Sequence, residues 1–154
     1  QTPEDIKRTA TYWRAKINFT NSAYSEAQSD LASIANFGGE RGAECQYMLC
    51  TYPYRAGDFK QTETAIFQLI DEFAAFDTWK YKSFLLLIDA YIGMEDWFQA
   101  KTTAESILEF VEDAETRTGA ENRLLQITTL EAMALETIDL PDSTSTEAAM
   151  PEAP

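Results

Sequence analysis

The chain of 154 residues is long enough for one domain with its own core, since 45% of its residues are hydrophobic and 12% are aromatic. A formal net charge of −14 would repel phosphate groups, so DNA, RNA and anionic lipid are not expected partners. No apolar run reaches the roughly 18 residues that a membrane span requires, so no span is expected either.

The first predicted unit covers residues 3–37 and contains two helices. Its first helix carries an apolar stripe of helical spacing made of Ile6, Ala10, Trp13 and Ile17. The segment Asn21-Ser22-Ala23 takes the place of the turn, which is expected to be one residue longer than the turns of later units. A second amphipathic run follows, and the pair Gly38-Gly39 is expected to end this hairpin.

The second predicted unit covers residues 42–75. Two amphipathic runs flank the break Ala56-Gly57-Asp58, and Phe59 begins the second run. Pro53 lies inside the first helix and removes a backbone hydrogen bond, at a cost of about 3 kcal/mol, so either the helix bends there or it ends earlier. Cys45 and Cys50 are too far apart along one helix to form a disulfide with each other.

The third predicted unit covers residues 79–114 and repeats the second at a distance of about 38 or 39 residues. Its break is Met94-Glu95-Asp96, and Trp97 stands where Phe59 stands in the second unit. A last helix over 117–139 has no partner helix and is expected to cap the array. Residues 140–154 are rich in proline and acidic residues and are expected to be a disordered tail.

These elements predict an all-α fold, because two-residue alternation of apolar and polar residues is absent. We expect residues 1–139 to form an antiparallel helix-hairpin solenoid of about three repeats plus the C-terminal capping helix.

The turn Gly57-Asp58-Phe59 and the aliphatic residues around it resemble the tetratricopeptide repeat. The matching positions are Leu49, Cys50, Gly57, Phe59, Ile66 and Leu69 in the second unit, and Phe84, Leu87, Tyr91, Asp96, Trp97, Ala100 and Ile107 in the third. Glu95 departs from the pattern by replacing the turn glycine, and Thr62 by replacing a small residue. The openings of several helices are similar to those of large tetratricopeptide proteins of Gram-negative bacterial envelopes.

The resemblance implies a partner-binding site on the concave face of the solenoid, which in this family comes from the first helix of each pair. Carried onto this sequence, it implies the residues Tyr47, Thr51, Tyr54, Arg55, Lys82, Leu85, Asp89 and Ile92. Tyrosine and arginine are also residue types that anchor protein interfaces.

No catalytic, metal-binding or cofactor-binding residue is predicted. The sequence contains no histidine, which removes the commonest general base and most zinc sites. Adjacent acids such as Asp71-Glu72 diverge on a helix, and the glycine-rich segment 38–42 lacks the lysine and hydroxyl of a phosphate loop.

We therefore expect a non-catalytic scaffold or adaptor that binds a protein or peptide. The alternative is a structural C-terminal segment, or a subunit, of a larger envelope-associated assembly. An enzyme with a helical fold is a third reading. The resemblance favours a periplasmic or envelope-associated location over a cytoplasmic one.

Overall fold

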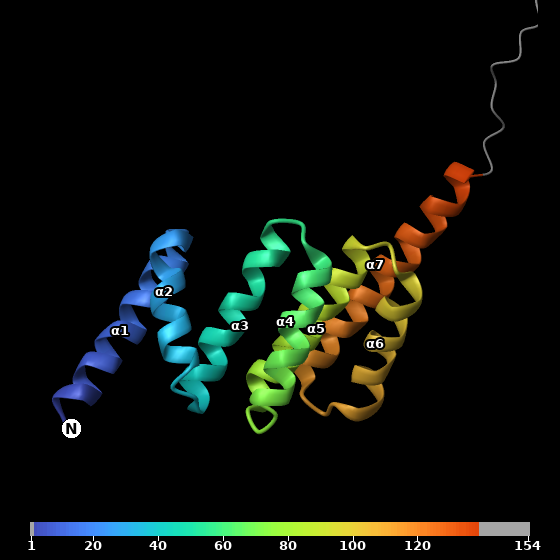
Figure 1. The fold of residues 1–154 in the computed structure, drawn as a ribbon. Coiled ribbons are helices and arrows are strands. Elements are labelled where there is room, and N and C mark those ends of the chain that lie inside the picture. Colours follow the sequence, from blue (N-terminus) through green and yellow to red (C-terminus); the bar gives the residue numbers. More distant parts are fainter. Residues whose placement is uncertain (1, 139–154) are drawn as a thin grey trace, which may run out of the picture.

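The structure is a computed structural model that describes residues 2–138, and this part of the chain folds into seven helices (Figure 1). The helices are α1 (Pro3–Thr20), α2 (Tyr24–Ala35), α3 (Gly39–Arg55), α4 (Phe59–Glu72), α5 (Asp77–Gly93), α6 (Trp97–Phe110) and α7 (Ala114–Ile138). Between residues 2 and 138 there is no strand, so the predicted all-α fold is confirmed. The tail predicted for residues 140–154 lies outside the described residues.

The helices follow one another in a row, and each packs against the next along the chain (Figure 1). In addition, α5 contacts both α3 and α7, so alternate helices also lie side by side. This arrangement is that of an all-α helical repeat, in which each hairpin buries its apolar surface on its neighbours.

The first helix of each hairpin ends in the same way. Ser22, Gly57 and Glu95 follow α1, α3 and α5 and all have a positive φ, at 63°, 76° and 58°. In each case the next residue donates its N–H to the carbonyl oxygen five positions earlier, at 2.8–3.0 Å. This 6→1 bond is the Schellman motif that ends helices, and it aligns the three units residue by residue.

The second helices begin alike in two units. The carboxylates of Asp58 and Asp96 accept hydrogen bonds from the N–H groups of Gln61 and Gln99, at 3.0 and 3.1 Å. Each aspartate thereby satisfies one of the backbone donors that a helix N-terminus leaves unpaired. The Asp58-Phe59 and Asp96-Trp97 pairs that identified the repeat are therefore helix starts.

Equivalent positions of the aligned units form the core. Each second helix buries three equivalent positions fully or nearly fully. In α2, α4 and α6, respectively, the first position is Ala27, Thr62 and Ala100, the second is Leu31, Ile66 and Ala104, and the third is Ile34, Leu69 and Ile107. Along the first helices, the equivalent buried residues are Ala15, Cys50 and Ile88. Burial of the same positions in successive units is the physical basis of the repeat, because no single hairpin encloses an apolar core.

The buried side of α1 differs from the predicted one. The stripe that contains Trp13 is exposed, and α1 instead buries Tyr12 and Ala15 in a cluster with Leu31 and Ile34 of α2. The prediction was wrong because α1 carries two apolar stripes on opposite sides, and the spacing of residues does not show which of them meets the neighbouring helix.

Three boundary predictions also change. The turn after α1 has three residues, like the other two, so the expected extra residue is absent. Helix α3 begins at Gly39 and continues through Pro53 to Arg55, so the helix does not end at the proline. Helix α7 begins at Ala114, earlier than expected.

Cys45 and Cys50 do not pair with each other, as predicted, and both free thiols are fully buried.

Candidate protein-interaction site

Four of the eight residues expected on the concave face meet at one hollow of ≈ 210 Å³. The hollow is lined by Tyr47 of α3, Lys82, Leu85, Leu86 and Asp89 of α5, and Arg123 of α7. Three consecutive odd-numbered helices thus contribute to the same depression. The position of these helices side by side follows from the stacking of the hairpins.

An ion pair between α5 and α7 forms one wall of this hollow. Both carboxylate oxygens of Asp89 accept hydrogen bonds from Arg123, at 2.7 Å from Nε and 2.7 Å from Nη2. The two side chains are about one quarter exposed. The fork-like geometry holds Arg123 in one orientation, and such bidentate pairs are stronger than single-contact pairs.

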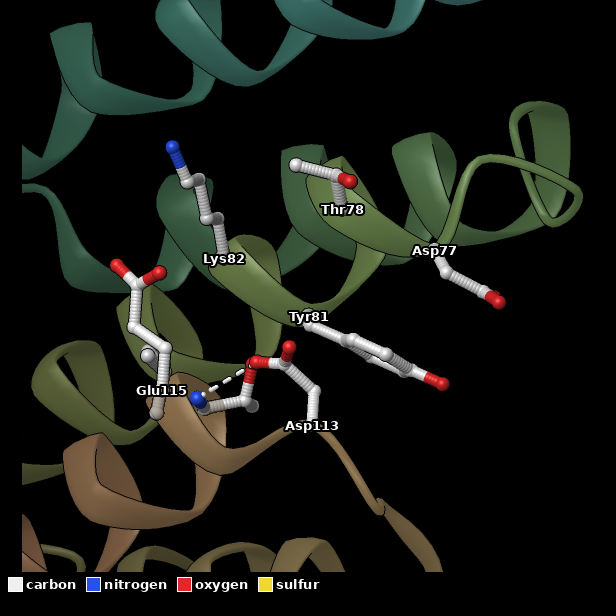
Figure 2. Close-up of a pocket in the computed structure, with 8 residues that line it drawn as sticks. Asp77, Thr78, Tyr81, Lys82, Asp113 and Glu115 are labelled. Atoms are coloured by element: carbon white, nitrogen blue, oxygen red, sulfur yellow. Dashed lines mark hydrogen bonds between the residues drawn. The ribbon is translucent and has the colours of Figure 1, made fainter.

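A second hollow of ≈ 250 Å³ adjoins the first, since Lys82 and Leu85 line both. Figure 2 shows Asp77, Thr78, Tyr81 and Lys82 along α5, facing Asp113 and Glu115 at the start of α7. We call the two hollows together the α5 groove. Its chemistry is mixed, with aromatic, aliphatic, cationic and acidic side chains.

Lys82 is the cation available at the centre of the α5 groove. No carboxylate lies within ion-pair distance of it in residues 2–138. Its ammonium lies 4.8 Å from the centroid of the Trp79 ring, which in turn lies 5.8 Å from the Tyr47 ring. The aromatic rings support the lysine without neutralising it.

Burial and charge shift the titration of several side chains around the α5 groove. Burial raises the pKa of Tyr47, and the negative charge of Asp89 raises it further. The same two causes raise the pKa of Tyr54. The pKa of Asp113 is lowered by hydrogen bonds from the hydroxyl and the N–H of Thr116, so Asp113 stays ionised at the start of α7. The groove therefore presents the neutral phenol of Tyr47 and the ionised carboxylate of Asp113.

The other four expected residues do not line these hollows. Thr51 donates its hydroxyl hydrogen bond to the carbonyl oxygen of Met48, at 2.7 Å, within its own helix. The ring of Tyr54 lies 5.6 Å from Phe59, and Ile92 packs against the main core. Arg55 points toward the first hairpin, where its guanidinium lies 4.3 Å from the centroid of the Tyr24 ring.

Arg123 was not among the predicted site residues, because the last helix was expected only as a cap. The sequence match between Gly119-Ala120 and Gly42-Ala43 carries the expected inner-face positions onto Glu121, Leu124 and Thr128, and not onto Arg123. Arg123 reaches the groove through its ion pair with Asp89, a contact between helices that local spacing does not show.

The described residues offer little for metal or thiol chemistry. No group of three or more cysteine, aspartate or glutamate residues in residues 2–138 is placed to hold a metal ion. Burial raises the pKa of the Cys45 and Cys50 thiols to about 12. Both thiols are therefore protonated at neutral pH and are poor nucleophiles.

Comparison with known proteins adds no identification: no family model matches the chain, and neither a curated protein nor a solved structure matches it. Of the seven described helices, none is both long enough and apolar enough to cross a membrane.

Proposed function

We propose that the chain is a non-catalytic, tetratricopeptide-like module that binds a protein or peptide partner in the α5 groove. The observation that carries the proposal is the convergence of side chains from α3, α5 and α7 on one continuous depression. Solenoids commonly use the inner surface of successive helices in this way. The tetratricopeptide resemblance, with its glycine-acid-aromatic turn, belongs to the same proposal.

The chemistry of the α5 groove suits a polypeptide ligand. Tyr47 and Tyr81 offer large apolar surfaces with polar tips, and Leu85 lies between the two hollows. The Lys82 ammonium is free to meet a carboxylate, and Asp89 and Arg123 can share hydrogen bonds with a peptide backbone. Tyrosine and arginine dominate the energetics of many protein interfaces.

The test is partner capture with matched charge reversals. The immobilised chain is exposed to lysate of the source organism, and bound proteins are quantified by mass spectrometry. Lys82→Glu is expected to lose the partner that the unaltered chain retains. Lys60→Glu is the matched control, because Lys60 is an exposed lysine on α4 and pairs with Glu63 of its own helix.

Circular dichroism must show equal helicity for the two variants and the unaltered chain. Equal capture by Lys82→Glu and by the unaltered chain would exclude the α5 groove as the binding site. Capture that is lost equally in both variants would point to a general effect of charge.

An envelope-associated location forms part of the same proposal and rests on the resemblance alone. Fractionation of source cells, followed by immunoblotting of periplasmic, membrane and cytoplasmic fractions, tests it.

A second proposal is that the chain is a structural part of a larger assembly and uses its edges. The exposed apolar side chains of α1 favour it, because large contiguous apolar patches commonly mark interaction surfaces. The native mass of the protein in its source tests this proposal. A species no larger than 17.4 kDa would contradict it.

A further inference from the structure

Helix α1 carries an apolar stripe that no part of the described chain covers. Ile6, Trp13 and Ile17 are 57%, 50% and 57% exposed, and Ala10 between them is exposed too. Because these residues recur at intervals of four, three and four, they form one continuous line along the helix. We call this line the α1 stripe.

The alignment of the turns shows what the α1 stripe corresponds to on α3. Counted back from Ser22 and from Gly57, the stripe positions Ala10, Trp13 and Ile17 match Cys45, Met48 and Tyr52, respectively.

Those three residues of α3 pack against the preceding helix, α2. Cys45 is fully buried in a cluster with Leu31 and Ile34, and Met48 and Tyr52 pack on the same cluster. The Tyr52 hydroxyl also donates a hydrogen bond to the carbonyl oxygen of Tyr24, at 2.7 Å. On α3, these positions are therefore the face that receives the preceding helix.

Helix α5 repeats this relationship. Its equivalent residues Ser83, Leu86 and Ala90 are 0%, 7% and 0% exposed, and α4 packs against α5 as α2 packs against α3. This face is therefore buried on both later first helices, and on α3 the preceding helix is what buries it. Only on α1, among the first helices of the described hairpins, is the face open.

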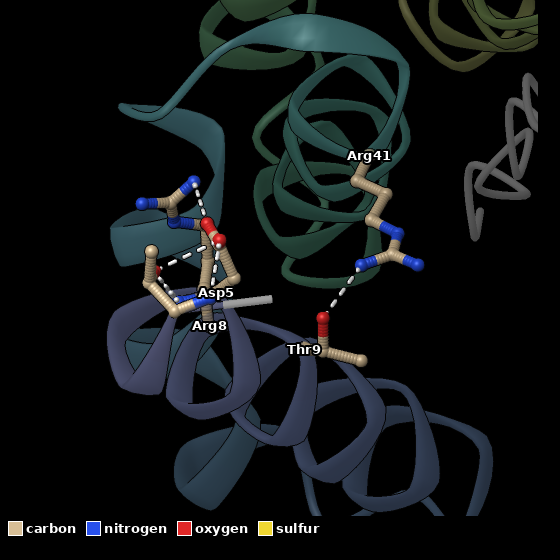
Figure 3. Close-up of polar contacts among 5 residues, drawn as sticks. Asp5, Arg8, Thr9 and Arg41 are labelled. Carbon is tan, nitrogen blue, oxygen red and sulfur yellow. Dashed lines mark hydrogen bonds and ion pairs between the residues drawn. The ribbon is translucent and has the colours of Figure 1, made fainter.

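The side of α1 opposite the stripe is already bound within the fold, because Tyr12 and Ala15 are buried in a cluster with residues of α2. Other contacts hold the flanks of the helix. Figure 3 shows Arg41 of α3 donating to the hydroxyl of Thr9, at 3.2 Å, and Asp5 paired with Arg8. The Arg8 guanidinium lies over the Phe37 ring, 3.3 Å from its centroid. The α1 stripe is therefore the side of α1 that packing inside the chain leaves free.

The charge of α1 indicates what kind of helix would cover the stripe. Residues 3–20 contain four basic and two acidic side chains, in a chain whose net charge is −14. Lys7 beside the stripe forms no ion pair with any residue from 2 to 138. The helices that cover the equivalent faces carry a net negative charge: α2 has Glu26 and Asp30 and no basic residue, and α4 has three acidic residues and one lysine. Of these, Asp30 pairs with Arg14 of its own hairpin. An acidic flank would complement α1.

We propose that the α1 stripe is the docking face for an amphipathic helix of the α2 kind, supplied by another helical hairpin. That helix has small and aliphatic residues on one face and acidic residues on its flank. A second copy of the chain docked stripe to stripe fits less well, because it would bring two basic helices together. This inference develops the second proposal above and does not depend on the α5 groove.

The test places a second α2 helix next to the α1 stripe, with the spacing along the chain that the hairpins already have. Residues 4–38 are duplicated in tandem within the full chain. The duplicated chain therefore runs from residue 1 to Gly38, continues with a second copy that begins at Glu4 and ends at Gly38, and then goes on from Gly39. The α2 of the added hairpin can then dock on the inner α1 stripe, and the outermost stripe stays exposed as before. In the duplicated chain, the outer copy of Trp13 is changed to phenylalanine. A second version carries phenylalanine in place of the inner Trp13 as well. The difference between the emission spectra of the two proteins is the emission of the inner Trp13.

We expect the emission of the inner Trp13 to shift to the blue and to lose most of its quenching by acrylamide, relative to Trp13 in the unduplicated chain. Placing Ala10→Lys in the inner copy should abolish both changes, because a charge would then lie in the docking face. The same substitution in the unduplicated chain is the control, where the exposed position should leave helicity and melting temperature unchanged. Unchanged quenching of the inner Trp13 in the duplicated chain would overturn the proposal.

A separate measurement identifies a competing occupant. Sedimentation equilibrium of the unaltered chain is expected to show a monomer. A dimer that Trp13→Glu dissociates would also overturn the proposal, since a second copy would then occupy the stripe. Unchanged quenching in the duplicated chain, or a dimer of the unaltered chain, would overturn the docking proposal alone. The proposal that the chain belongs to a larger assembly is tested separately, by the native mass of the protein in its source.

Discussion

Asp89 of α5 and Arg123 of α7 form a two-pronged ion pair whose two hydrogen bonds are both 2.7 Å long. The pair joins two helices that are not neighbours along the chain, and it forms one wall of the α5 groove. The same contact therefore fixes the packing of the last helix and orients a guanidinium toward the groove.

Breaking this pair is expected to destabilise the fold. A double-mutant cycle with Asp89→Asn and Arg123→Gln should give a coupling of about 1 kcal/mol, because the pair is bidentate and only about one quarter exposed. Urea unfolding followed by circular dichroism measures the four proteins of the cycle.

The coupling should fall in 1 M salt, where exposed charges are screened. The pair between Arg14 and Asp30 offers a comparison on the first hairpin, since it too is bidentate but its arginine is more exposed. A coupling near zero for Asp89 and Arg123 would contradict the role given to the pair.

The helices and the repeat could be predicted from the sequence, because local spacing and turn chemistry determine them. Asp58-Phe59 and Asp96-Trp97 each combine a helix cap with an aromatic residue at the first helical position, so they mark a helix start without knowledge of the fold. The positions of Ile66 and Leu69 on one buried face likewise follow from helical periodicity.

What could not be predicted depends on contacts between distant residues. Tyr12 and Trp13 are adjacent, yet Tyr12 is buried and Trp13 is exposed, and only the position of α2 decides between them. Arg55 was expected on the concave face, but the ring of Tyr24 draws its guanidinium toward the first hairpin. Arg123 enters the site through Asp89, a partner 34 positions away.

The positive φ values of the turns predict opposite effects for two substitutions. Glu95 has a φ of 58°, in the place where Gly57 has 76°. Because a side chain in this conformation costs roughly 1 kcal/mol, Glu95→Gly should stabilise the fold by up to about 1 kcal/mol and Gly57→Ala should destabilise it by about 1 kcal/mol. Urea unfolding measures both changes, and Ala56→Gly, at a residue with negative φ, should bring no stabilisation. Loss of stability in Glu95→Gly would refute the alignment of the two turns.

Two neighbours on α4 should respond very differently to truncation. Ile66 is fully buried, whereas Phe67 is half exposed. Ile66→Ala should cost about 3 kcal/mol through lost burial and the cavity left behind. Phe67→Ala removes a larger side chain and yet should cost less than about 1 kcal/mol. Melting temperatures and urea midpoints check both, and a larger loss for Phe67→Ala would mean that the outer face of α4 is covered.

The buried thiols and Tyr91 predict how stability depends on alkaline pH. The pKa values of Cys45 and Cys50 are raised to about 12 by burial, and that of Tyr91 to about 12 by burial and by its hydrogen bond to Glu63. The unfolded chain loses these protons near pH 9 to 10, whereas the folded chain keeps them. These three groups should therefore leave the free energy of unfolding unchanged below about pH 8.5 and lower it steadily from there toward pH 12.

The thiols also permit a kinetic check. At pH 8 a disulfide reagent such as dithionitrobenzoate should react with neither cysteine of the folded chain and with both in urea, since it attacks through the thiolate. Replacing both thiols, by Cys45→Ala and Cys50→Ala, should flatten the alkaline loss of stability by the share that the thiols contribute, and Tyr91→Phe should flatten it further. Other tyrosines whose pKa values are raised by burial contribute the remainder; they are Tyr12, Tyr47, Tyr52 and Tyr54. Rapid labelling of the folded chain would show that α3 opens on its own, and an unchanged alkaline slope in the triple variant would assign the loss to other groups.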